Sequence, residues 1–152
     1  MFYKAELDGI ICSGIIKNGK PTFALLDERV PSNNKIKREE ALTLLAKKYF
    51  ISHGPATLQD FSWWSGLNLT NSKLALEVAK NDLVSKIIDD QTYWSSNSFS
   101  LPNHEMEVAY LLPTFDEFII SYKDRTATLT SEKNDKTISS NGISQPVIIA
   151  GG

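Results

Sequence analysis

The chain has 152 residues, which suits one ordinary domain or a small domain with attached segments. Hydrophobic residues make up 41% and charged residues 22%, as in soluble globular proteins, and no apolar run approaches the roughly 18 residues that cross a bilayer. A net charge of −2 argues against strong non-specific binding to nucleic acid, which needs clustered Lys and Arg. Because the first residues lack the pattern of a signal peptide, we expect a cytoplasmic protein.

The chain offers few side chains for metal or redox chemistry. Cys12 is the single cysteine, and with only His53 and His104 beside it a metal site is not expected. We predict that Cys12 lies on a strand as a buried, unreactive thiol. No cofactor is expected.

Residues 1–34 are predicted to form a β-hairpin. Residues 5–12 and 22–27 have strand character and flank Asn18-Gly19, a dipeptide typical of tight hairpin turns. An isolated hairpin is only marginally stable, so this one needs a surface to pack on. The proline and polar residues of 30–34 are interpreted as a linker.

Residues 35–95 follow the order of a winged helix–turn–helix. The first predicted helix covers 37–52 and has one apolar face. The second begins at Thr57, which forms a T-x-x-D capping pair with Asp60, and ends at Gly66. The other predicted elements are a third helix over 71–80, capped by Thr70, and a hairpin of strands 84–88 and 91–95 that turns at Asp89-Asp90. The order and lengths of these elements together indicate the domain type.

Residues 96–152 are predicted to form a small β-rich part after a polar linker at 95–103. Its predicted strands cover 106–112, 118–122 and 146–149, and residues 130–141 are predicted to be a polar loop. The predicted fold class is therefore α+β, with a winged helix–turn–helix domain between an N-terminal β-hairpin and a small β-rich C-terminal part.

The third predicted helix occupies the position that enters the major groove in helix–turn–helix proteins. Its outward residues are predicted to include Asn71 and Ser72, which can bond bases or phosphates, and Lys73 and Lys80, which can neutralise phosphates. The alternative is a solvated helix face in a winged helix that contacts protein. Residues 35–95 hold eight basic and seven acidic residues, so any DNA affinity must come from their placement. The outward set also includes Leu76 and Glu77, whereas Leu74, Ala75 and Val78 are predicted to face the core.

The adjacent Trp63 and Trp64 point about 100° apart on a helix, so they cannot face the same core. Trp64 is predicted to pack inside. Trp63 is predicted to be partly exposed, either as a stacking surface for a base or as a contact with a neighbouring domain.

Charged residues gather between positions 111 and 125. Lys123 and Arg125, two residues apart on an extended chain, are predicted to share one face that suits a phosphate. The alternative is an ion-pair cluster with the neighbouring carboxylates. Asp116 and Glu117 would point to opposite faces of an extended chain, so they are poorly placed as a general acid and base.

The sequence contains no recognisable catalytic motif. The sequence contains no phosphate-binding loop, dinucleotide fingerprint, nucleophile elbow or H-E-x-x-H motif. His53, just before Gly54-Pro55, is interpreted as a helix-capping residue. No catalytic residue is predicted.

Long segments nevertheless carry a family resemblance. The most specific are EEALTLLAKKYFISHGPATLQDFSWWSGL (39–67) and LLPTFDEFIISYKDR (111–125), with further matches at 5–14, 24–31 and 141–152. Through these segments the chain resembles the winged-helix DNA-binding proteins related to bacterial glycosylases that unhook interstrand crosslinks. The resemblance covers most of the chain, and its two main blocks are independent.

The resemblance implies a larger parent protein. Full-length members are expected to have tandem winged helices closed by a β-rich part, and the active ones to cleave the N-glycosidic bond of alkylated purines without a metal. Their catalytic signature is Q-x-Q or Q-x-D in the N-terminal portion, whereas Gln59, Gln91 and Gln145 are isolated here. We therefore expect a fragment whose residues 1–30 end a preceding winged helix and whose family continues past Gly152.

Three hypotheses follow from the sequence. The first is a DNA-binding, DNA-positioning portion of a glycosylase-like protein whose partners are double-stranded DNA, alkylated or crosslinked, and the rest of the parent chain. The second is a winged helix that packs against protein without DNA affinity. The third is an active parent enzyme in which this portion only shapes the site.

Overall fold

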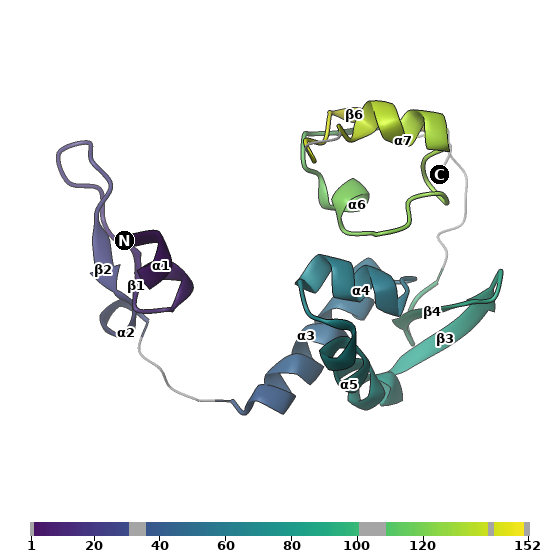
Figure 1. Cartoon of the computed structure of the whole chain (residues 1–152), viewed down its shortest axis with the longest axis horizontal. Coiled ribbons are helices and arrows are strands. Elements are labelled where there is room, and N and C mark those ends of the chain that lie inside the picture. Colours follow the sequence, from purple (N-terminus) through teal and green to yellow (C-terminus); the bar gives the residue numbers. More distant parts are fainter. Residues whose placement is uncertain (1, 31–35, 101–108, 140–141, 151–152) are drawn as a thin grey trace. The chain divides into compact units, whose positions relative to one another are not determined.

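The computed structural model describes residues 2–30, 36–100, 109–139 and 142–150 (Figure 1). The chain divides into two compact units, residues 1–37 and 38–152. The architecture is a mixture of helices and two-stranded antiparallel sheets. Within the described segments, no helix is both long and apolar enough to cross a membrane.

The N-terminal unit contains the predicted hairpin, but in shorter form. Its elements are α1 (Phe2–Leu7), β1 (Ile11–Ser13), β2 (Phe23–Leu25) and α2 (Leu26–Arg29). The strand predicted over 5–12 is wrong in its first half, where Lys4 and Asp8 form an ion pair of 3.0 Å at helical spacing. The turn prediction is confirmed, because Asn18 and Gly19 have φ angles of 51° and 72°, as a primed hairpin turn requires. Cys12 lies on β1 as predicted, although it is half-buried rather than buried.

The second unit begins with three helices that share one core. They are α3 (Arg38–His53), α4 (Leu58–Ser65) and α5 (Leu69–Ala79), and a single 3-10 turn, η1 (Lys80–Asp82), follows. The core consists of Leu42, Ala46, Tyr49, Phe50, Ala56, Phe61, Ala75, Leu76, Ala79 and Leu83. It joins α3 to α5 through small and apolar side chains.

The ends of α4 are those predicted from the sequence. Thr57 and Asp60 form a reciprocal capping box, and Gly66 ends the helix with a φ of 68°, which glycine adopts without strain. The start of α5 differs from the prediction, because Asn68 and not Thr70 is the cap. The Asn68 side chain accepts a hydrogen bond of 2.9 Å from the Asn71 N–H.

A hairpin of β3 (Leu83–Ile88) and β4 (Gln91–Ser96) follows, as predicted. Its turn residues Asp89 and Asp90 have φ angles of 48° and 60°. The hairpin is fastened to the end of α3, since Ala56 and Trp94 exchange backbone hydrogen bonds of 3.0 and 2.8 Å. Gly54 permits this approach, because a Cβ there would lie 2.4 Å from the Phe50 carbonyl oxygen and 2.7 Å from that of Trp94.

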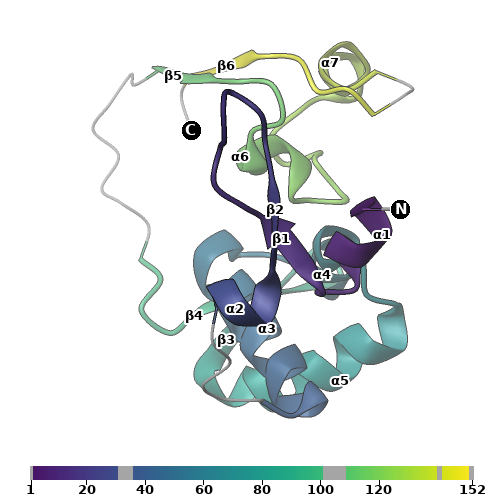
Figure 2. The ribbon, with the colours of Figure 1, turned by 90° about the vertical axis from the view of Figure 1, so that its left-hand side faces the viewer.

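The rest of the chain is mixed rather than β-rich. It contains β5 (Ala109–Leu112), α6 (Glu117–Ile120), α7 (Ser131–Thr137) and β6 (Val147–Ala150). The strands β5 and β6 pair antiparallel (Figure 2), with Ala109 opposite Ala150 and Leu112 opposite Val147.

Two predictions for this part are wrong. The strand predicted over 118–122 is replaced by α6, because the Asp116 side chain caps that helix by accepting a hydrogen bond of 2.9 Å from the Phe118 N–H. The loop predicted over 130–141 contains α7, where Lys136 and Glu132 pair at helical spacing. Most of the 30–34 linker, residues 101–103 of the second linker and the first three residues of the 106–112 strand lie outside the described residues.

Candidate nucleic-acid interface

The outer face of α5 differs from the predicted one. Ser72 is fully buried and Leu76 is 7% exposed, so their predicted outward positions are wrong. Conversely, Leu74 and Val78 are 49% and 52% exposed and do not face the core. The Ser72 hydroxyl can be buried because it donates a hydrogen bond of 3.0 Å to the Asn68 carbonyl oxygen.

The cationic residues of α5 and η1 differ in exposure and in whether they form ion pairs. Lys73 is exposed and has no side-chain partner among the residues described. Lys80 is half-buried and forms an ion pair with Glu77. Asn71 is half-buried near the start of the helix. The exposed face of α5 is therefore mixed in charge and partly apolar, and Lys73 is its free cation within the described part.

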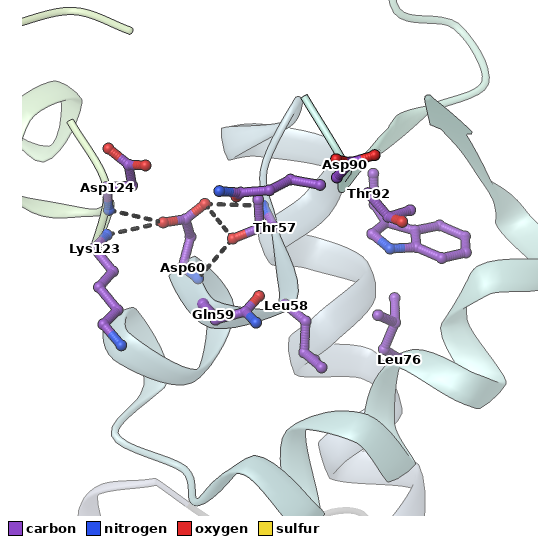
Figure 3. A pocket seen from close by; sticks show the side chains of 11 residues that line it. Thr57, Leu58, Gln59, Asp60, Leu76, Asp90, Thr92, Lys123 and Asp124 are labelled. Carbon is purple, nitrogen blue, oxygen red and sulfur yellow. Dashed lines mark hydrogen bonds between the residues drawn. The ribbon is translucent and has the colours of Figure 1, made fainter. Parts of the chain in front are cut away.

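A groove of about 770 Å³ opens beside α4 (Figure 3). The start of α4, Leu76 of α5, the hairpin turn with Asp90, and the Lys123-Asp124 segment line it. Figure 3 shows the Asp60 carboxylate between Thr57 and the backbone of the Lys123-Asp124 segment. Asp60, Asp90 and Asp124 make this lining acidic.

Asp60 links α4 to a segment more than sixty residues away in the chain. Its side chain accepts hydrogen bonds from the Thr57 N–H at 2.9 Å and the Thr57 hydroxyl at 2.7 Å. Its other carboxylate oxygen accepts from the backbone N–H groups of Lys123 at 2.9 Å and Asp124 at 3.3 Å. Only 3% of Asp60 is exposed, and protein groups rather than water satisfy both of its carboxylate oxygens.

Lys123 and Arg125 do not lie on a strand, so the premise of their shared strand face is wrong. The Lys123 side chain is exposed, whereas Arg125 is half-buried. The Arg125 Nε donates a hydrogen bond of 2.7 Å to the Ile119 carbonyl oxygen, and its guanidinium carbon lies 5.9 Å from the centre of the Trp63 ring. Burial lowers the pKa of Arg125, while the negative charge of Asp60 opposes that shift. No ion pair joins Lys123 or Arg125 to a carboxylate within the described residues.

Trp63 combines a contact with an exposed surface. Its indole Nε1 donates a hydrogen bond of 3.1 Å to the Ile120 carbonyl oxygen, yet 55% of the residue is exposed. Trp63 and Lys123 both line a second depression, of about 480 Å³. Trp63 therefore contacts α6 within the same compact unit and keeps a free surface.

The carboxylates of Asp116 and Glu117 make structural hydrogen bonds. Asp116 caps α6, and Glu117 accepts hydrogen bonds from the Ser121 hydroxyl and, at 3.1 Å, from Trp64 Nε1. The Ser121 hydrogen bond, supported by those of Trp64 and His53, lowers the pKa of Glu117. These contacts fasten α6 to α3 and α4 and leave no acid and base pair.

Buried aromatic groups complete this contact. The Tyr49 and His53 rings stack at 4.8 Å between centroids, and the Tyr122 hydroxyl donates a hydrogen bond of 2.8 Å to the His53 carbonyl oxygen. Burial raises the pKa of Tyr49, so its phenol remains neutral and donates to the Ser121 carbonyl oxygen at 3.2 Å. No cluster of three His, Cys, Asp or Glu that could hold a metal occurs in the ranges the structure describes.

Comparison with known proteins identifies the family. The family model described as "DNA glycosylase AlkZ-like" matches residues 4–152. The chain belongs to the DNA glycosylase AlkZ-like family. Among solved structures, Streptomyces sahachiroi DNA glycosylase AlkZ is similar, with a TM-score of 0.76 and 21% identity over 93% of this chain and 41% of that chain. No curated protein matches.

The AlkZ likeness shows a common fold, and this chain spans 41% of the length of that AlkZ chain. Membership places the chain among DNA glycosylase-like proteins. The resemblance expected from the sequence is thereby confirmed at the level of the family.

Sequence reasoning missed some residues of this surface in the AlkZ-like chain. Gln59 lines both depressions, and it was not among the predicted site residues. The link from Asp60 to Lys123 and Asp124 had no sequence signal, because the capping pair explains Asp60 locally.

Proposed function

We propose that this chain is the DNA-positioning portion of a glycosylase-like protein for alkylation or crosslink repair, and that residues 35–95 work as a winged helix–turn–helix. The observation that carries the proposal is the order α3, α4, α5 and the β3–β4 hairpin around one core. α5 packs on α3 through one face and leaves its other face to solvent, as a helix that enters a DNA groove must. The AlkZ-like family supports DNA as the partner.

The proposed phosphate contacts begin with Lys73 and Lys123, whose side chains are exposed and unpaired within the described segments. Lys80 becomes available when its ion pair with Glu77 opens, at small cost because the pair is near the surface. Asn71 is proposed to approach the groove from the start of α5. Ser72 is withdrawn from the set because it is fully buried.

Arg125 has a different proposed role. Its Nε is bonded to the Ile119 carbonyl oxygen and its guanidinium lies 5.9 Å over the Trp63 ring, so it supports the Trp63 surface and adds positive charge beside it. The partners proposed are double-stranded DNA, alkylated or crosslinked, and the rest of a parent chain. Catalysis is not assigned to any residue of this chain, because its glutamines form no Q-x-Q or Q-x-D pair.

A second candidate function is packing against protein without DNA affinity. It is favoured by the partly apolar outer face of α5, where Leu74 and Val78 are about half exposed. The acidic hairpin turn, Asp89-Asp90, would also repel phosphate. DNA binding requires the positive charge of Lys73, whereas protein packing does not.

The test is charge reversal on α5 and η1. Lys73→Glu and Lys80→Glu are compared with Lys133→Glu, which changes an exposed lysine on α7. Under the DNA-binding proposal, each of the first two variants weakens duplex binding and lowers the slope of log affinity against log salt by about one. The control leaves both unchanged. Unchanged binding in the Lys73→Glu, Lys80→Glu double variant would refute the proposed contact face.

A further inference from the structure

We propose that Trp63 is a stacking platform for an unpaired nucleobase, and that Lys123 receives a phosphate of the same strand. The inference rests on the proposed DNA-binding function and adds to it the feature of DNA that this surface recognises, a base outside the paired stack. A single-stranded or extrahelical base has two free faces, whereas a paired base in a duplex has none that a side chain can reach without unstacking.

The indole of Trp63 is held in a fixed orientation. Its Nε1–H is bonded to the Ile120 carbonyl oxygen at 3.1 Å. The guanidinium of Arg125 lies over the ring at 5.9 Å, and Arg125 is itself fixed by its hydrogen bond to the Ile119 carbonyl oxygen. The consecutive carbonyl groups of Ile119 and Ile120 thus position the cation and the ring.

The remaining surface of Trp63 is open. With its N–H edge and the surface under Arg125 in use, 55% of the residue is still exposed. An aromatic surface that is fixed before binding loses little conformational entropy when a ligand stacks on it. The depression of about 480 Å³ that Trp63 helps to line is large enough for a planar base.

The lining of this depression favours a nucleotide over other planar ligands. Lys123 is its charged residue, and no carboxylate lines it within the described part of the chain. Gln59, also in the lining, has no side-chain partner among the described residues, so its amide is free to bond a base edge. Lys123 also lines the larger groove, but there it is outnumbered by Asp60, Asp90 and Asp124, so that lining is less suited to a phosphate.

The test compares three labelled DNA probes on the full chain. These are a fully paired duplex of about 20 base pairs, the same duplex with one unpaired thymidine, and a short oligothymidine strand. The variants are Trp63→Leu, which removes the aromatic face, and Trp63→Phe, which keeps one. Leu44→Ala is the control, because Leu44 is 43% exposed on α3 and has no proposed contact with DNA.

The expected result is selective. Trp63→Leu weakens binding of the two probes with an unpaired base by about tenfold, Trp63→Phe restores most of that loss, and neither changes binding of the paired duplex. Probes with an unpaired base also quench part of the wild-type tryptophan fluorescence, and this part is absent in Trp63→Phe. Thermal unfolding shows whether each variant is folded. Lys123→Ser, which changes an exposed side chain, should also weaken binding of the probes with an unpaired base.

The failures can be told apart. Equal binding of paired and unpaired probes, with no effect of Trp63→Leu, would overturn the platform and leave the proposed duplex binding intact. Binding of unpaired probes alone would support the platform and overturn the duplex proposal. Absence of binding to all three probes at low salt would overturn both. If Trp63→Leu does not fold, an unquenched wild-type protein bound to the unpaired probe overturns the platform.

Discussion

Replacement of Asp60 by Asn is expected to destabilise the unit formed by residues 38–152. Asp60 is 3% exposed, and its carboxylate accepts two hydrogen bonds from Thr57 and two from the backbone of the Lys123-Asp124 segment. Asn has the same shape but a single acceptor oxygen. Its amide NH₂ must therefore face either the Thr57 N–H or the N–H groups of the distant segment.

The magnitude follows from these contacts. Loss of the capping interaction costs about 0.5–2 kcal/mol, and a buried N–H left without an acceptor costs about 1–3 kcal/mol. We expect the free energy of unfolding to fall by about 2–4 kcal/mol. At a typical urea dependence for a small protein, the urea midpoint falls by about 1–2 M.

The assay is urea unfolding followed by circular dichroism, with hydrogen exchange at the Lys123 and Asp124 amides as a local probe. Asp90→Asn is the control, because it removes the same charge at an exposed turn position where Asn also tolerates a positive φ. The control should unfold like the wild type. A loss below about 0.5 kcal/mol in Asp60→Asn, with unchanged exchange at both amides, would refute the assigned link.

Further changes test other parts of the structure. Gly54→Ala should lower the free energy of unfolding by at least about 1–3 kcal/mol in a urea titration, since its Cβ would meet three backbone atoms at 2.4–2.8 Å; wild-type stability would contradict the close packing. Glu117→Gln should be less stable than the wild type near neutral pH, and the difference should shrink as the pH falls from about 5 to 3. This sign follows because the pKa of Glu117 is lowered in the fold, so its stabilisation is lost as the pH falls through the folded-state pKa; a difference that grows toward low pH would contradict it. Ser72→Lys should unfold the α3–α5 packing without raising DNA affinity, and a stable, tighter-binding variant would return Ser72 to the DNA-contact set.

Local signals predicted the parts of the fold that local interactions determine. The capping box of Thr57 and Asp60, the glycine end of α4 and the β3–β4 hairpin depend on residues close in sequence, and the structure contains all three. The strand predicted over 118–122 was wrong because aromatic and β-branched residues suggested a strand, whereas the side-chain cap from Asp116 begins a helix there.

The candidate site was predictable only in part, since it depends on which helix face is buried. Leu74, Leu76 and Val78 alternate along α5, so hydrophobicity did not reveal the buried face, and packing against α3 selected Leu76. The polar Ser72 could join that face only because Asn68 satisfies its hydroxyl. The surroundings of Trp63 could not be predicted from the sequence either, because its partner Arg125 lies far along the chain.

The most direct test of the account is the fluorescence anisotropy of a labelled duplex of about 20 base pairs, measured with this chain at about 50 and 200 mM salt. The account predicts binding at the lower salt that weakens steeply at the higher salt, because Lys73 and Lys123 displace counterions from phosphates. Absence of binding at the lower salt would contradict the central claim and would leave this AlkZ-like chain as a protein-packing module.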